Sequence, residues 1–174
     1  MPTNVEIKAC VNDRERLAHL AASLSGGPPT VLRQEDTFFR VPAGRLKLRK
    51  HGPAQGELIF YRRPDQTGPK SSDYSISVTT EPDTLRDVLA AALGVVGVVR
   101  KERRLYLVDR TRIHLDRVDG LGDFVELEVV LRPGQSEEEG RATAADLMRL
   151  LEIDPVDLIA GAYLDLLRRE AGLK

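Results

Sequence analysis

The chain has 174 residues, of which 30% are charged and 41% hydrophobic, and its formal net charge at pH 7 is −1. This length suffices for a real hydrophobic core, so we expect one domain over residues 1–174. The balanced charge, the lack of a run of 18 apolar residues and the lack of a signal peptide predict a cytoplasmic protein with neither nucleic-acid nor membrane partners. The single cysteine, Cys10, excludes an internal disulfide, and we expect it in the core.

The first half of the chain predicts one helix and five strands. Residues 5–11 alternate as a strand, and Asn12-Asp13 then caps a helix over residues 14–24 whose leucines share one face. Apolar and polar residues alternate again in four further strands, which cover residues 30–41, 45–50, 57–63 and 74–79. Between them we expect a hairpin loop over residues 51–56 and a polar, Gly/Pro-rich loop over residues 64–72.

The second half predicts three helices and at most four strands. A helix begins at Asp83 or Thr84 and ends at Gly94, before strands over residues 96–103, 105–108, 112–118 and 124–131. A capping box from Ser136 to Glu139 opens a helix to about Leu151, and Asp154-Pro155 starts a fourth helix. About eight strands with helices between and after them predict an α+β fold, an antiparallel barrel rather than a parallel doubly wound sheet.

Charged residues gather on one face of at least five of these strands. In the stretch GRLKLRK, the cations Arg45, Lys47 and Arg49 alternate with Leu46 and Leu48, so one strand face is cationic and the other aliphatic. The same i, i+2 spacing joins Glu6 with Lys8, Lys101 with Arg103, Arg112 with His114 and Asp116, and Glu126 with Glu128. The opposite, aliphatic faces are what the amphipathic helices need to cover.

If helices pack outside a closed sheet, the charged faces point into the barrel. Burying charges costs several kcal/mol per ion unless they are paired or ligated. Cations that hold a polyanion, and carboxylates that hold a divalent metal touching it, would satisfy such an interior, and a triphosphate with Mg²⁺ or Mn²⁺ fits this description. Solvated ion pairs on an open sheet remain the alternative.

An ordered set of motifs along nearly the whole chain resembles the CYTH proteins. The segments are NVEIK, RQEDTFF, GRLKLR, ELIFYRRPD, VVRKERRLY, RIHLDRVDGLGDFVELE and AYLDLL. This family of triphosphate tunnel metalloenzymes comprises class IV adenylyl cyclases, thiamine triphosphatases and inorganic triphosphatases. The resemblance implies an eight-stranded antiparallel barrel, the CYTH fold, with helices packed outside and a tunnel that binds triphosphate and Mg²⁺ or Mn²⁺.

The resemblance also implies roles for individual residues. A metal site would comprise Glu6, Glu126, Glu128 and Asp116, with Asn4 at the position of the first glutamate of the family signature ExExK. Asp116 would orient Arg112 or take part in the metal site, and Lys8, Arg112 and Asp116 would be catalytic. Either Arg62 or Arg63 fills a basic position, and strand parity favours Arg63. The triphosphate would be bound by Lys8, Arg45, Lys47, Arg49, Arg63, Lys101, Arg103, Arg112 and His114.

Several functions are compatible with this pattern. The segments GLGDF and VELE look most like the class IV adenylyl cyclase branch, which converts ATP to cyclic AMP and pyrophosphate. A triphosphate hydrolase acting on thiamine triphosphate or tripolyphosphate is the close alternative. Asn4, together with Ser75 and Ser77 in the strand where many members carry a glutamate, leaves open a non-catalytic polyphosphate- or nucleotide-binding module. We expect a monomer or homodimer whose partner is a small-molecule triphosphate.

Overall fold

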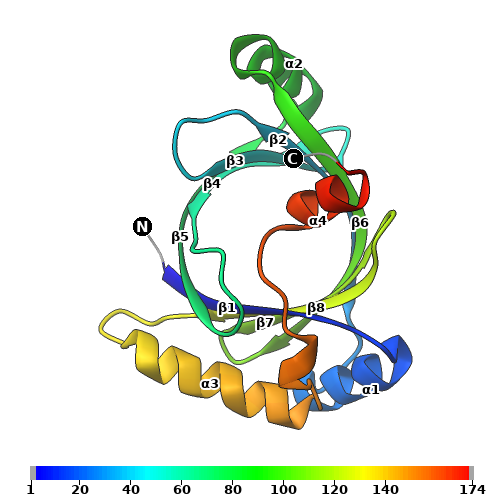
Figure 1. The fold of residues 1–174 in the computed structure, drawn as a ribbon, viewed down its shortest axis with the longest axis vertical. Helices are drawn as coiled ribbons and strands as arrows, with labels where there is room; N and C mark the ends of the chain where they lie inside the picture. Colours follow the sequence, from blue (N-terminus) through cyan, green and yellow to red (C-terminus); the bar gives the residue numbers. More distant parts are fainter. Residues whose placement is uncertain (1–2, 173–174) are drawn as a thin grey trace.

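The computed structural model describes residues 3–172, and its centre is a closed antiparallel β-barrel (Figure 1). Around the barrel the strands follow the order β1-β5-β4-β3-β2-β6-β7-β8. The strands are β1 (Thr3–Cys10), β2 (Thr30–Phe39), β3 (Arg45–Gly52), β4 (Gln55–Arg62), β5 (Lys70–Thr79), β6 (Val95–Val108), β7 (Thr111–Val118) and β8 (Gly122–Val130). The predicted fold class, an eight-stranded barrel with helices outside, is therefore confirmed.

The helices lie on parts of the outer face of this barrel and across one opening. They are α1 (Arg14–Ser25), α2 (Pro82–Leu93), α3 (Glu137–Leu150), the 3₁₀ helix η1 (Pro155–Asp157) and α4 (Tyr163–Glu170). In Figure 1, α1 and α3 lie outside β1, β7 and β8, α2 lies on the opposite side, and α4 crosses a barrel opening. The expected caps are present, because Asp13 accepts a hydrogen bond from the Arg16 backbone and Ser136 and Glu139 form a capping box. Among residues 3–172, no helix is long and apolar enough to cross a membrane.

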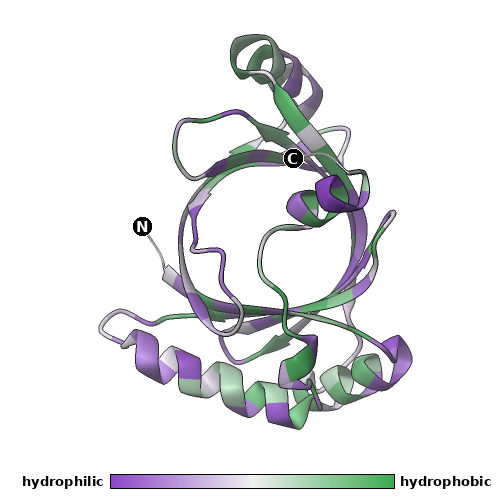
Figure 2. Cartoon of the chain, viewed as in Figure 1, coloured by the Kyte–Doolittle hydropathy of each residue, from purple (hydrophilic) through white to green (hydrophobic). Residues whose placement is uncertain are grey.

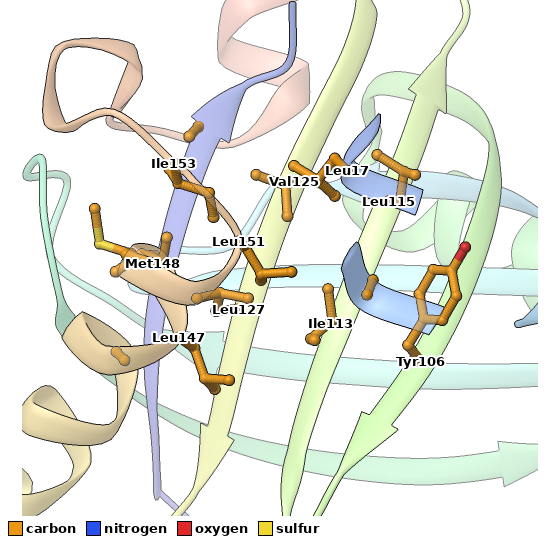
Figure 3. Close-up of a cluster of buried hydrophobic side chains, with 14 of the residues drawn as sticks. Leu17, Tyr106, Ile113, Leu115, Val125, Leu127, Leu147, Met148, Leu151 and Ile153 are labelled. Atoms are coloured by element: carbon orange, nitrogen blue, oxygen red, sulfur yellow. The ribbon is translucent and has the colours of Figure 1, made fainter. Parts of the chain in front are cut away.

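The main hydrophobic core lies between the barrel and the helices α1 and α3, not inside the barrel (Figure 3). Strand residues that point outward meet apolar residues of the two helices, both of which also carry hydrophilic faces (Figure 2). Burying apolar surface stabilises the fold by about 25 cal/mol per Å². This stabilisation holds the helices against the outer face of the barrel, and the inward strand faces are left to polar residues. The labelled core residues are Leu17, Tyr106, Ile113, Leu115, Val125, Leu127, Leu147, Met148, Leu151 and Ile153.

Some predicted boundaries are wrong. Residues 96–103 and 105–108 belong to one strand, because Arg104 continues the ladder between Val31 and Leu115. The predicted hairpin loop 51–56 is too long, since β3 extends to Gly52 and β4 begins at Gln55. Similarly, β5 begins at residue 70 inside the predicted loop. In each case pairing with a neighbouring strand overrides local turn propensity.

The end of the chain and Cys10 also differ from expectation. Asp154-Pro155 opens only the three-residue η1, and the next helix begins at Tyr163. The backbone between them runs beside β1, where the Ile159 N–H donates to the Lys8 carbonyl at 3.0 Å. Cys10 is exposed rather than buried, because it is the last residue of β1.

Candidate functional site

A cavity of about 300 Å³ occupies the interior of the barrel, and all eight strands contribute to its lining. The predicted inward orientation of the charged strand faces is therefore correct. All predicted site residues except Arg45 and Asp116 line the cavity: Glu6, Lys8, Lys47, Arg49, Arg63, Lys101, Arg103, Arg112, His114, Glu126 and Glu128. The structure also settles the choice between neighbouring arginines at the end of β4 in favour of the cavity-lining Arg63.

The strongest concentration of positive charge surrounds Asp36, a residue that is 1% exposed. Lys47 and Lys101 each place Nζ 3.0 Å from Asp36 Oδ2. Arg49 donates two hydrogen bonds of 2.8 Å to the same carboxylate. Three cations therefore share one buried anion. We refer to Lys47, Arg49, Lys101 and Asp36 as the cationic cluster.

The strand register explains why this cluster forms. Asp36 pairs directly with Arg49 across β2 and β3, and its neighbours at i±2, Phe38 and Gln34, pair with Lys47 and Lys101. Directly opposed and diagonal residues on one sheet face lie within side-chain reach. Sequence reasoning missed Asp36. Its place in the segment RQEDTFF at even spacing from Gln34 and Phe38 was a usable signal for an inward position.

Burial changes the ionisation of the cationic cluster. It lowers the pKa of Lys47 to about 8, and repulsion from Arg49 adds to the effect. Burial likewise lowers the pKa of Lys101 to about 7, although attraction to Asp36 opposes the shift. The pKa of Asp36 stays well below its usual range despite burial, because Arg49, Lys101 and Lys47 surround it. Binding of a polyanion would favour the protonated, positively charged forms of Lys47 and Lys101 over their neutral forms.

A second cluster contains the three predicted metal ligands on β1 and β8, and each ligand is paired with a cation. Glu6 contacts Arg63 at 3.0 Å, Glu126 contacts Lys8 at 3.0 Å, and Glu128 contacts Arg112 at 2.6 Å. The register places Glu6 opposite Glu128. Burial raises the pKa of Glu6, and repulsion from Glu128 and Glu126 adds to the rise although Arg63 opposes it. The carboxylates are thus close enough to repel one another.

The donor atoms here suit a hard divalent cation. Within residues 3–172, no three His, Cys, Asp or Glu side chains converge as a ready metal site. However, the buried Asn4 donates to Glu128 Oε1 at 2.7 Å while its own Oδ1 has no hydrogen-bond partner. An amide oxygen without a partner beside repelling carboxylates is an oxygen-rich set of the kind that Mg²⁺ and Mn²⁺ prefer. The residues therefore fit such an ion, provided that the carboxylates exchange their present cationic partners for it.

Asp116 lies in the barrel wall behind the cavity and holds Arg103, not the predicted Arg112. Arg103 donates to both carboxylate oxygens, at 2.7 and 2.6 Å, and the Tyr163 hydroxyl donates to the same group at 2.9 Å. The pKa of Asp116 is lowered in spite of burial because Arg103 stabilises its charge. Both carboxylate oxygens are thus already engaged, and Asp116 is placed to fix the guanidinium of Arg103.

The segment from Gly161 to Asp165 closes one end of the tunnel. The Gly161 carbonyl accepts hydrogen bonds from Lys8 and Arg63, each at 3.1 Å. The Tyr163 ring lies 4.0 Å from Lys8 Nζ, close enough for a cation–π contact. Arg45, predicted to bind phosphate, pairs at this end with Asp165 at 2.7 Å and with Asp65 at 3.0 Å. Sequence reasoning did not identify Tyr163 as part of the site, because its position depends on how the chain returns to the barrel.

Ser75 and Ser77, which stand in the strand where many family members carry a glutamate, do not line the cavity. Tyr74 and Ile76 of β5 line it instead. Tyr74 pairs with Tyr61 across β4 and β5, and both side chains face the interior.

His114 of β7 also lines the cavity, and its Nδ1 is 3.5 Å from Glu126. Burial lowers the pKa of His114, and repulsion from Arg103 adds to the effect.

The fold and its lining define a tunnel protein, a closed antiparallel barrel with paired charges inside it. The CYTH domain model matches residues 2–163, and the chain belongs to this family. The protein PH1012 of Pyrococcus horikoshii has a similar solved structure, with a TM-score of 0.83 and 23% identity over 94% of this chain and 98% of that one. A Vibrio parahaemolyticus protein described as a candidate adenylate cyclase has a TM-score of 0.73 and 18% identity, covering 94% of this chain and 97% of that one. A comparison with curated proteins finds no match.

Proposed function

We propose that the protein is a divalent-metal-dependent enzyme that binds a triphosphate in the tunnel and converts ATP to cyclic AMP and pyrophosphate. The observation that carries this proposal is the cationic cluster, in which three cations face one carboxylate. With both lysines protonated, the cluster has an excess of two positive charges, which a polyphosphate chain would neutralise. The fold shared with the candidate cyclase of Vibrio parahaemolyticus supports the choice of branch.

The wall residues divide into groups that hold phosphate and groups that act near the reacting atoms. The cationic cluster, with Arg103 held in place by Asp116, would bind and orient the phosphates. Glu6, Glu126 and Glu128, with the free oxygen of Asn4, would hold Mg²⁺ or Mn²⁺, which when bound neutralises phosphate charge. In cyclisation the ribose 3′-oxygen bonds to the α-phosphorus as the bond to pyrophosphate breaks, and the hydroxyl proton needs an acceptor.

Lys8 is our candidate for that acceptor, with Arg112 as a nearby charge-stabilising group. Burial lowers the pKa of Lys8, although Glu126 opposes the shift, so its neutral form is more accessible than that of an exposed lysine. Arg112 lines the same cavity, and its side chain is more exposed than that of Lys8. The same arrangement could instead orient water, so hydrolysis of the triphosphate is the rival reaction.

Product analysis would distinguish these functions. We would incubate the protein with Mg²⁺ or Mn²⁺ and with ATP, thiamine triphosphate or tripolyphosphate, and identify every product. Cyclic AMP and pyrophosphate at many turnovers would support the cyclase, whereas ADP and phosphate alone would contradict it and support a hydrolase. Binding without product would indicate the non-catalytic module, for which Asn4 in place of a glutamate is the sequence argument. Activity should be lost in Lys101→Met but kept in Lys50→Met, because Lys50 instead pairs with Asp83 of α2 at 2.7 Å.

A further inference from the structure

The two ends of the tunnel differ in chemistry. One end is closed by Gly161, Ala162 and Tyr163, which lie against the charged interior. Toward the other end, the inward residues of β6 change from Lys101 and Arg103, each 5% exposed, to Leu105 and then Leu107, which is 58% exposed. The strand therefore passes from buried cations to exposed leucines along one face.

Other strands repeat this change at the same open end. On β2, Leu32 precedes Gln34 and is the cross-strand partner of Arg103. On β5, Ile76 follows Tyr74 on the inner face and is 48% exposed. Val78, the next inward residue on β5, is 75% exposed and pairs with the cavity-lining Glu57. We refer to these residues as the apolar collar: Leu32, Ile76, Val78, Leu105 and Leu107.

The collar lies on opposing walls of the barrel. Leu32, Ile76 and Leu105 line the cavity, and Val78 and Leu107 continue the same strand faces beyond it. In the closed order of eight strands, β5 and β6 are four places apart, so their aliphatic side chains face each other across the opening. Between these walls on one side, His51 and Glu57 line the cavity and form a pair at 3.3 Å. On the other side, the cavity-lining Arg112 is the cross-strand partner of Leu107. The mouth thus combines two aliphatic walls with polar groups at their edges, an environment suited to a flat ring with polar atoms at its edge.

We propose that the apolar collar binds the uncharged organic group of the substrate and makes the enzyme select an organic triphosphate over bare tripolyphosphate. The inference rests on the proposed function, because it takes the cationic cluster as the phosphate site. Gly161, Ala162 and Tyr163 close the other end of the tunnel, so we expect the group attached to a triphosphate held there to extend to the open mouth. Exposed aliphatic side chains gathered at one opening gain free energy by contact with such a group.

The test compares two ligands in a variant that keeps the charge of the tunnel unchanged. In Ile76→Ser/Leu105→Ser, we expect the Kd for ATP to rise roughly tenfold from lost apolar contact. The Kd for tripolyphosphate should stay within about twofold, because its charges meet the same cations. Both constants would be measured by titration calorimetry in the presence of Mg²⁺. Val88→Ser is the matched control, since Val88 is 59% exposed on α2, away from the cavity.

The possible outcomes separate the collar from the site beneath it. An equal loss of affinity for both ligands, or an unchanged affinity for ATP, would overturn the collar without contradicting the phosphate site of the wild-type protein. If the wild-type protein binds neither ligand, the proposed function fails and the collar fails with it. If the double variant melts at a much lower temperature than the wild-type protein, Val78→Ser replaces it, because the Val78 side chain is largely exposed. This substitution must still weaken the binding of ATP more than that of tripolyphosphate.

Discussion

At the scale of single residues, the buried lysines of the cationic cluster should make ligand binding depend on pH. The pKa of Lys101 is lowered to about 7 and that of Lys47 to about 8, first by burial. As the pH rises through these values, the free protein loses positive charge that a polyanion needs, so the affinity for tripolyphosphate should fall. Binding should also raise both pKa values and therefore take up protons.

Calorimetric titrations at pH 8 in buffers with different ionisation enthalpies would measure this proton uptake. Because tripolyphosphate also exchanges protons near this pH, the uptake that belongs to the lysines is the difference between the wild-type protein and a variant without the lysine. Lys101→Met should reduce the uptake, whereas Lys50→Met should leave it unchanged. Binding without proton uptake would show that the lysines are fully charged before the ligand arrives.

A second prediction at this scale concerns the carboxylates of the proposed metal site, Glu6, Glu126 and Glu128. Glu128→Gln keeps the shape of the side chain but removes the charge that faces Glu6 and Asn4. We expect the variant to fold, because the repulsion on Glu6 decreases, but to lose turnover. Mn²⁺ should raise the melting temperature of the wild-type protein, since it binds only the folded site, and should raise that of the variant much less.

Glu138→Gln provides the control for this experiment, because Glu138 is exposed in the first turn of α3. The control should respond to Mn²⁺ like the wild-type protein. Full activity of Glu128→Gln together with an undiminished response to Mn²⁺ would remove this glutamate from the metal site and leave Glu6 and Glu126 without their expected third partner.

At the scale of elements, the seating of α4 on β6 depends on the absence of a side chain at one position. A Cβ atom at Gly97 would lie 2.5 Å from Leu164 Cδ1, so in Gly97→Ala the buried Leu164 side chain must shift, and we expect α4 to move with it. Overpacking of this kind costs about 1–3 kcal/mol, and the melting temperature should fall accordingly. Displacement of α4 would also disturb Tyr163 and the neighbouring Gly161, so we expect weaker tripolyphosphate binding.

Gly27→Ala is the matched control, because a Cβ atom there meets nothing within 4 Å and the backbone does not require glycine. Thermal melting and calorimetry of both variants would measure the effect. If Gly97→Ala lost stability but bound tripolyphosphate with unchanged affinity, the closing segment would be a structural element without influence on the phosphate site.

At the scale of the whole molecule, the ligand site exists only when the barrel is closed. Asp36 and Lys47 come from β2 and β3, Lys101 from β6, and the carboxylates from β1 and β8. Tripolyphosphate should therefore bind the folded state alone and stabilise it by about 2.7 kcal/mol at a concentration one hundred times its Kd. Melting curves at increasing concentration would measure this rise. A melting temperature that does not respond to tripolyphosphate would contradict a built phosphate site.

The sequence by itself determined the sidedness of the strands. Alternation of period two is a local property of extended backbone, so Lys47, Arg49, Glu126 and Glu128 could be assigned to one face without knowledge of the fold. The amphipathic helices then indicated which face is covered, because apolar surface must be buried somewhere. Together with the resemblance to the CYTH proteins, this reasoning predicted the barrel and most of the residues that line it.

Only the tertiary structure decided which charges meet. Asp36 of β2 pairs with cations from β3 and β6, and Asp116 holds Arg103 instead of Arg112, because the register between strands sets cross-strand neighbours and is not written in any single strand. The return of the chain through Gly161 to Tyr163 likewise depends on packing between distant segments. For the same reason, the difference between the closed end and an open end with exposed aliphatic side chains becomes visible only once all eight strands are in register.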